Sequence, residues 1–206
     1  MIDHENNMLK KGEIGCSLSH MKIYKRMMDE NIPIALVLED DAVLLDELVP
    51  AMADIEQYDD ANKPNVYILT AIERYYPMIK KKMGSTTLYK VHRTCYTHGY
   101  IINNAAARKL YEHFYPVWMV ADSWEVFKLI AGIKIYGTIP YVIDNNDFNK
   151  AQSVIFHESG DFLTRKKYEK QLLAKKPGYL LKKALHRLSR AFARKSWVHD
   201  RSQYKR

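Results

Sequence analysis

Three consecutive carboxylates, Glu39, Asp40 and Asp41, directly follow the apolar run Ile34–Leu38. A run of five apolar residues is typical of a fully buried strand. In an open α/β sheet, ligands bind outside the carboxyl ends of the strands, where these acids would lie. Adjacent carboxylates repel one another unless a cation, a donor or water intervenes, and a divalent metal with oxygen ligands is a natural counter-charge. The alternative is that the acids open a turn or cap the next helix.

Two other classes of protein that place acids after a buried strand fit this sequence poorly. A P-loop NTPase also needs the phosphate-binding motif G-x-x-x-x-G-K-[ST], which the sequence lacks. A response-regulator receiver needs a phospho-accepting Asp on a later strand, but no Asp occurs between Asp60 and Asp122. The acids therefore belong to a different kind of site.

The residues around the acids resemble a third class, the nucleotide-sugar glycosyltransferases. Gly12-Glu-Ile-Gly-Cys-Ser-Leu-Ser-His20, followed by Ile34-Ala-Leu-Val-Leu-Glu-Asp-Asp-Ala42, closely resembles glycosyltransferase family 25. A second matching block is Thr97-His-Gly-Tyr-Ile-Ile-Asn-Asn104. A looser third block runs from Val120-Ala-Asp-Ser-Trp124 through Gly132-Ile-Lys-Ile-Tyr136 to Gln152-Ser-Val-Ile155. That family includes bacterial lipooligosaccharide β-galactosyltransferases and relatives that galactosylate collagen.

The resemblance implies a GT-A-like (Rossmann-like) α/β domain that transfers a hexose, galactose from UDP-galactose, to a hydroxyl of a lipid-linked lipooligosaccharide or lipopolysaccharide acceptor, with inversion. It also implies a divalent metal, manganese or magnesium, that neutralises the leaving diphosphate. Glu39, Asp40 and Asp41 are the expected oxygen ligands. Because side chains alternate along a strand, Glu39 and Asp41 would share one face, which favours this pair.

The acceptor hydroxyl must lose its proton, and a nearby carboxylate is the usual base. Asp122 opens a short helix expected in the third block, so it is the first candidate, and Glu125 is the second. The alternative role for Asp122 is to cap that helix.

The expected substrate-binding residues lie in the first two matching blocks. They are Glu13, Gly15, Ser19, His20, Thr97, His98 and Gly99. The histidines are expected to contact sugar, phosphate or metal, and the glycines to permit close backbone approach. The alternatives are a helix-start acid, local caps, turn glycines and ordinary surface or core histidines.

The alternation of apolar periodicities predicts an α/β domain. A loop that enters a helix is expected over residues 12–30. Helices are also expected over 46–57 and 122–131, and after an N-cap at Asn103 or Asn104. Strands are expected over 66–70, 86–91, 96–102 and 133–138, with an exposed loop over 72–83. Family members normally carry a further strand–helix–strand segment before Gly12, so we expect an N-terminally incomplete catalytic domain over residues 1–160.

The net charge of +8 comes from the basic tail over residues 161–206: residues 165–206 carry 15 Lys/Arg against 2 acids. Helices are expected there over 161–175 and 178–195. The second carries an apolar stripe, Leu181, Leu185, Leu188 and Phe192, with Trp197 beyond it, as in helices that bind an anionic membrane surface. The alternative is that the stripe packs on the body.

The rest of the chain, residues 1–164, carries 17 Lys/Arg against 22 acids, which argues against nucleic acid as a partner. Two scattered cysteines and the absence of a membrane-spanning apolar run favour a cytoplasmic protein, peripheral on the inner face of the membrane. A catalytically silent fragment that binds a membrane surface is the alternative to an enzyme.

Overall fold

The structure, a computed structural model, describes residues 9–84, 86–145 and 162–196. The helices are α1 (Lys11–Asp29), α2 (Leu48–Tyr58), α3 (Asn104–Phe114), α4 (Trp124–Ile130), α5 (Phe162–Ala174) and α6 (Tyr179–Ser189), and α6 leads into the 3-10 turn η2 (Arg190–Phe192). The strands are β1 (Ile34–Leu38), β2 (Ala42–Leu44), β3 (Asn65–Ile68), β4 (Arg74–Met83), β5 (Thr86–Arg93), β6 (Gly99–Asn103), β7 (Lys134–Thr138), β8 (Ile143–Asn145) and β9 (Arg194–Lys195).

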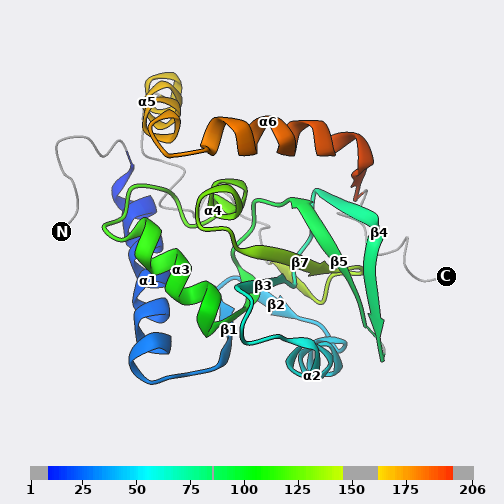
Figure 1. The fold of residues 1–206 in the computed structure, drawn as a ribbon. Coiled ribbons are helices and arrows are strands. Elements are labelled where there is room, and N and C mark those ends of the chain that lie inside the picture. Colours follow the sequence, from blue (N-terminus) through cyan, green and yellow to red (C-terminus); the bar gives the residue numbers. More distant parts are fainter. Residues whose placement is uncertain (1–8, 85, 146–161, 197–206) are drawn as a thin grey trace.

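The described residues form a mixed α/β fold around a sheet with the strand order β1-β6-β3-β7-β5-β4-β9 (Figure 1). Only β3 and β7 pair in parallel, and the other neighbours in this sheet are antiparallel. A small second sheet pairs β2 with β8. The predicted α/β class is confirmed.

Helices cover both faces of the main sheet, as the alternation of side chains along β3 requires. Val66 and Ile68 join a buried cluster with residues of α1, α3 and α4. Tyr67 and Leu69 join a second cluster, on the opposite face, with residues of α2. The central strands and the other expected helices therefore form with bounds close to those predicted. The loop expected at the start of 12–30 is wrong, because α1 is helical from Lys11.

β1 has the predicted bounds, but the prediction that it is fully buried is wrong. In the described chain it pairs only with β6 and lies at an edge of the sheet. Val37 is buried, whereas Leu38 is 41% exposed. An apolar run specifies a strand but not the number of neighbours that the strand acquires.

The exposed loop predicted over residues 72–83 is also wrong, because Arg74–Met83 forms β4. This strand pairs with β5, and its register shifts between Tyr76 and Lys80. Such an irregularity accommodates Pro77, which has no N–H to donate to the ladder. Met78 and Ile79 are exposed there.

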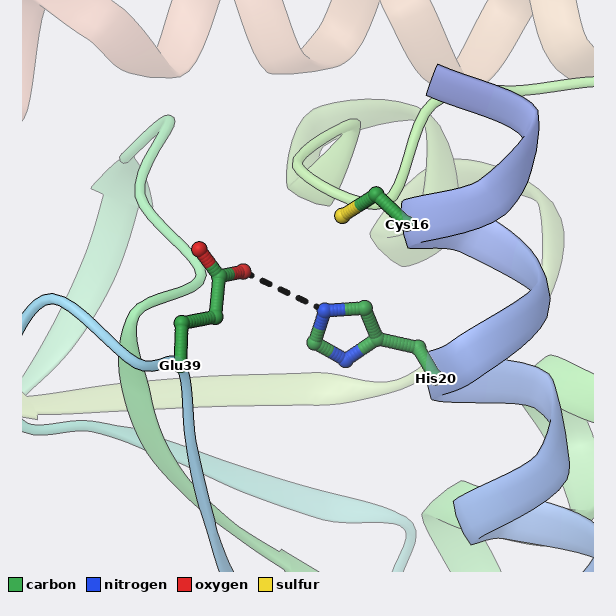
Figure 2. A group of neighbouring side chains, drawn as sticks. All are labelled: Cys16, His20 and Glu39. Atoms are coloured by element: carbon green, nitrogen blue, oxygen red, sulfur yellow. Dashed lines mark hydrogen bonds and ion pairs between the residues drawn. The ribbon is translucent and has the colours of Figure 1, made fainter. Parts of the chain in front are cut away.

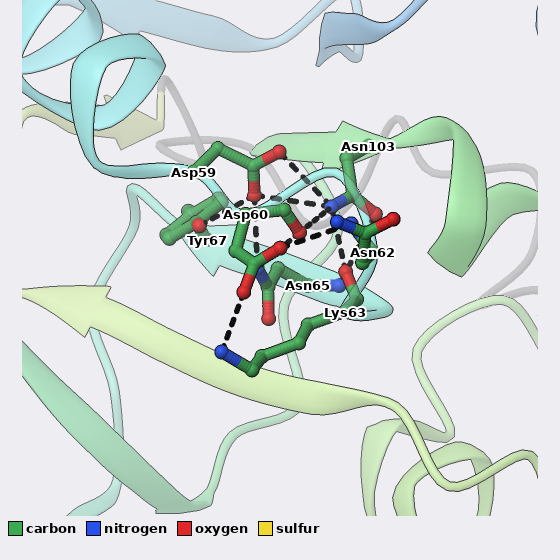
Figure 3. Close-up of polar contacts among 7 residues, drawn as sticks. All are labelled: Asp59, Asp60, Asn62, Lys63, Asn65, Tyr67 and Asn103. Carbon is green, nitrogen blue, oxygen red and sulfur yellow. Dashed lines mark hydrogen bonds and ion pairs between the residues drawn. The ribbon is translucent and has the colours of Figure 1, made fainter.

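A polar network joins α2, β3, β6 and α3 at the end of β6 (Figure 3). Asn103 is the N-cap of α3, as predicted, and its side-chain oxygen accepts from the backbone N–H of Ala106 at 3.0 Å. Its amide donates to both carboxylate oxygens of Asp59 at 3.0 Å. Asp59 also accepts from Tyr67 at 2.7 Å and from Asn65 at 2.9 Å. The network fixes the end of the sheet opposite to the residues that follow β1.

The basic tail packs on the rest of the molecule. Leu173 and Tyr179 form a buried cluster with Leu129 of α4, and the ammonium of Lys182 donates to the backbone carbonyl of Leu129 at 3.1 Å. The helix predicted to reach residue 195 ends at Ser189, and β9 then pairs with β4. The predicted domain boundary after residue 160 falls in a stretch outside the described residues.

Candidate active site

The first two sequence blocks meet because β6 runs antiparallel to β1. The first residues of β6 therefore lie beside the last residues of β1, with Leu38 opposite Gly99. The backbone N–H of Glu39 donates to the carbonyl of His98 at 3.1 Å. The carboxyl end of β1 and the segment before β6 thus form one surface.

Glu39 is the centre of this surface, and α1 faces it (Figure 2). Nε2 of His20 lies 3.2 Å from Oε1 of Glu39, and Thr97 also hydrogen-bonds this carboxylate. Burial alone would raise the pKa of Glu39, but these hydrogen bonds and the nearby His20 and His98 outweigh burial and lower it. Glu39 is therefore held as an oriented carboxylate.

His20 is fixed from its other side by two buried phenols. The Tyr100 hydroxyl lies 2.7 Å from Nδ1 of His20, and the Tyr24 hydroxyl lies 2.8 Å from that of Tyr100. Burial, the largest cause in both cases, raises the pKa of each phenol far above neutral pH. Both ring nitrogens of His20 are thus engaged, which sets the orientation of the imidazole.

Asp40 and Asp41 lie in a turn beyond the end of β1 and are exposed. Strand alternation cannot pair Asp41 with Glu39, because the strand ends at Leu38. Across the described ranges, neither side chain makes a hydrogen bond or ion pair.

Cys16, His20 and Glu39 each offer a potential ligand atom, and these atoms lie within 4.8 Å of one another. A thiol and an imidazole suit zinc-like ions, whereas magnesium and manganese prefer oxygen. Burial, followed by the charges of Glu39 and Asp122, raises the pKa of Cys16 to about 11. Because magnesium and manganese prefer oxygen ligands, the neighbouring carboxylates fit the expected ion better than this trio does.

Asp122 lies on the segment that enters α4, and its cap alternative is wrong because Ser123 is the N-cap residue. Partial desolvation by the surrounding protein raises the pKa of Asp122. The negative charges of Glu13 and Glu39 raise this pKa further, whereas the positive charge of Arg165 lowers it. The residue surface is still exposed, so solvent screens these charges. Asp122 therefore shares the electrostatic environment of Glu39.

Arg165 reaches this region from α5. Its guanidinium contacts Glu13 at 2.6 Å and Glu169 at 2.9 Å. Glu13 also accepts from the backbone N–H of Lys10 at 2.8 Å, so the helix-start role of this acid is confirmed. The tail thus supplies a cation beside Asp122.

Glu125 is not brought to the cluster. Its carboxylate lies 3.8 Å from Nε2 of His186, at the junction between α4 and α6. Ser19 is exposed on α1 and donates to the carbonyl of Gly15 at 3.0 Å, a local helix contact.

The two glycines differ in what surrounds them. A Cβ on Gly15 would meet nothing within 4 Å among the described residues. A Cβ on Gly99 would lie 2.6 Å from Cδ1 of Ile143. Close approach is therefore required at Gly99, and a side chain of β8 makes that approach.

The sequence predictions did not include Tyr24, Tyr100 or Arg165 among the site residues. Tyr100 lies in the second matching block two residues after His98, and strand alternation could have placed both on one face. Arg165 carries no such signal, because its contact with Glu13 joins distant parts of the chain. Gln152–Ile155 of the third block lies outside the described residues.

Comparison with known proteins identifies a family whose matched region contains the first two sequence blocks. The model of glycosyltransferase family 25, described as an LPS biosynthesis protein, matches residues 2–124. The chain is 26% identical over 112 residues to lipooligosaccharide biosynthesis protein lic2B of Haemophilus influenzae. That alignment covers 51% of this chain and 42% of the relative, so the chain matches less than half of the relative's length. Since the family model covers more than half of the sequence, the chain belongs to glycosyltransferase family 25.

Proposed function

We propose that the protein transfers galactose from UDP-galactose to a hydroxyl of a lipooligosaccharide or lipopolysaccharide acceptor, with inversion at the anomeric carbon. The observation that carries this proposal is the convergence of His20, Glu39 and Thr97 from two separate family blocks, with Asp122 in the same electrostatic environment. The name of the Haemophilus relative supports the class of acceptor.

Each of the two acids has a distinct role in this proposal. Asp122 accepts the proton of the attacking hydroxyl, since it is exposed and its raised pKa makes it a stronger base than an ordinary aspartate. Glu39 stays ionised, because its pKa is lowered, and its negative charge favours the cationic character that develops at the anomeric carbon.

Manganese or magnesium is proposed to bind the carboxylates that follow β1. Asp40 and Asp41 are exposed in the turn, and Glu39 precedes them, which gives an oxygen-only donor set of the kind these ions prefer. The ion would neutralise the negative charge of the leaving diphosphate.

Donor binding and turnover test the proposal. UDP binding is measured by calorimetry, and UDP release from UDP-galactose is measured with and without manganese. Asp122→Asn is expected to lower turnover by about 10²–10⁴-fold with UDP binding retained, because it removes only the base. Asp46→Asn, which removes an exposed carboxylate outside the cluster, is the control. Absence of both turnover and UDP binding in the unmodified protein would refute the enzyme and favour the alternative of a catalytically silent binding module.

We further propose that α6 and η2 bind the anionic inner face of the cytoplasmic membrane. The predicted apolar stripe does not pack on the body: Leu181, Leu185, Leu188 and Phe192 are 57–77% exposed. The opposite side of α6 packs on the rest of the protein: the ring of His186 stacks on that of His92, with 4.1 Å between the ring centroids. α6 lies along the outside of the molecule (Figure 1). None of the described helices is both long and apolar enough to cross a bilayer, so the binding would be peripheral.

Charge favours lipid as the partner of this stripe. Residues 179–195 contain six Lys/Arg and no Asp or Glu, and each cation near an anionic surface contributes about 1 kcal/mol. Trp197 of the predicted anchor lies outside the described residues.

Vesicle co-sedimentation tests the membrane proposal. The double variant Leu185→Ser/Leu188→Ser is expected to bind phosphatidylglycerol vesicles more weakly by roughly tenfold or more, since two apolar side chains no longer insert. Val49→Ser/Met78→Ser removes two exposed apolar side chains elsewhere and is the matched control. Equal binding to neutral and anionic vesicles, or a stripe-dependent dimer in light scattering, would contradict the proposal.

A further inference from the structure

A concave site lies beside the candidate active site. This pocket of about 340 Å³ is bordered by β4, β5, β9, η2 and the segment after β3. Four of its lining side chains are cationic and one is acidic. They are Arg74, Arg93, Arg190, Lys195 and Glu73.

Three of the cations form a row across adjacent strands. Arg74 of β4 pairs directly with Arg93 of β5 on one side and with Lys195 of β9 on the other. Directly paired residues project from the same face of a sheet, and like charges in such positions destabilise it. Glu73 offsets part of this charge through an ion pair with Arg93 at 2.9 Å. An anion in the pocket would offset more of this charge.

The pocket adjoins the candidate active site through the segment that precedes β6. Tyr96 lines the pocket, and its ring centroid lies 5.3 Å from that of His98. The carbonyl of Tyr96 accepts a hydrogen bond from the indole of Trp124 at 2.8 Å. Trp124 lies two residues after Asp122 in the sequence. A ligand that spans Tyr96 would therefore extend from the cations toward the proposed base.

We propose that this pocket binds a phosphate group of the saccharide acceptor, so that the protein acts on phosphorylated saccharides. The proposal rests on the proposed transferase function. Guanidinium groups bind phosphate oxygens in a bidentate manner, which suits a pocket with three arginines. The sugar attached to this phosphate lies across the Tyr96 ring, an aromatic surface that can pack against it. The diphosphate of the donor is assigned to a different place, the metal ion proposed at the carboxylates that follow β1.

Binding of inorganic phosphate and glucose 6-phosphate, with glucose as the neutral comparison, tests the pocket directly. Arg74→Gln and Arg190→Gln are each expected to weaken binding of both phosphates by roughly ten- to a hundredfold, because each removes a charge-assisted contact. The matched control is Lys80→Gln/Lys82→Gln, which removes two exposed cations of β4 outside the pocket. Ionic strength is kept constant with chloride, so that general screening does not count as binding.

The melting temperature separates a binding role from a structural one. Arg74→Gln is expected to leave the Tm without phosphate unchanged or higher, because it relieves repulsion in the row, and to abolish the rise in Tm that phosphate causes. A lower Tm without phosphate, together with an unchanged response to phosphate, would show that the cations serve the fold and would overturn the proposal.

Calorimetry with UDP distinguishes the acceptor from the donor. Unchanged UDP affinity in Arg74→Gln and Arg190→Gln supports an acceptor site, whereas a parallel loss of UDP and phosphate binding assigns the pocket to the donor and overturns the proposal. If the proposed transferase function is wrong, the result is different. The unmodified protein then neither binds UDP nor turns over the donor, while phosphate binding still depends on Arg74.

Discussion

At the scale of single residues, the candidate site depends on a buried chain of hydrogen bonds. Tyr24, Tyr100, His20 and Glu39 are connected in that order, and only the last of them reaches the exposed turn after β1. Buried polar groups in such a chain are costly to leave without partners. The orientation of Glu39 is therefore linked to residues deep in the core.

Removing the Tyr100 hydroxyl tests this dependence. Tyr100→Phe leaves Nδ1 of His20 and the Tyr24 hydroxyl without their partner, so the free energy of unfolding is expected to fall by about 1–3 kcal/mol. Urea titration at pH 7 measures it. The matched variant Tyr24→Phe removes the hydroxyl at the buried end of the chain and leaves the contact between Tyr100 and His20, so its loss of stability should be smaller. Equal losses would argue against a chain that converges on His20.

The sequence identified the acids and histidines of the site but not all of their neighbours. Glu39, His20 and Thr97 could be predicted because they lie within short recognisable blocks. Arg165 could not, since its contact with Glu13 depends on how α5 packs and no local pattern encodes that. Near Asp122, the helix was predicted to start two residues too early: it begins at Trp124, and Ser123 is the N-cap.

At the scale of elements, periodicity predicted the helices and the central strands, but position within the sheet was not predictable. The edge position of β1 follows from its pairing partners, which the apolar run Ile34–Leu38 does not specify. β4 was missed because its lysines and Pro77 lack the alternation of a half-buried strand, and its pairing with β5 and β9 overrides that local signal.

The network around Asn103 provides a test at this scale. Asn103→Ala removes the N-cap of α3 and the donors to Asp59, so the free energy of unfolding is expected to fall by about 1–3 kcal/mol. Asn62→Ala, an exposed amide in the neighbouring loop, is the control. A loss no larger than that of the control would show that the network contributes little. Chemical denaturation with both fluorescence and circular dichroism measures the change.

At the scale of the whole molecule, the tail is joined to the body through a titratable contact. Burial, followed by the charges of Lys128 and His92, lowers the pKa of His186 to about 4. The ring of His186 stacks on that of His92, whose pKa is also lowered by burial. The carboxylate of Glu125 lies 3.8 Å from Nε2 of His186. The neutral forms of both histidines are thus favoured when α6 is docked.

Stability is therefore expected to depend on pH through this contact. Because the pKa of His186 is lower in the folded state, its contribution is fully present above about pH 6.5 and is lost as the pH falls toward about 4, up to about 3 kcal/mol. His186→Phe keeps the stacked ring without a titrating group and should flatten this part of the profile of unfolding free energy against pH. His113→Asn, at a half-buried position on α3 outside this contact, is the control. Identical profiles for all three proteins would contradict the assignment.

The pairing of β9 with β4 has a consequence for the order of assembly. Arg190, Lys195 and Ser196 line the pocket together with Arg74 and Arg93, which are synthesised much earlier. Contacts between residues far apart in the sequence form late, because closing a long loop is entropically costly. During synthesis, the sheet up to β7 can collapse while the pocket still lacks one wall. A nascent chain at that stage would already contain the residues around Glu39, but it would not yet contain the complete row of cations.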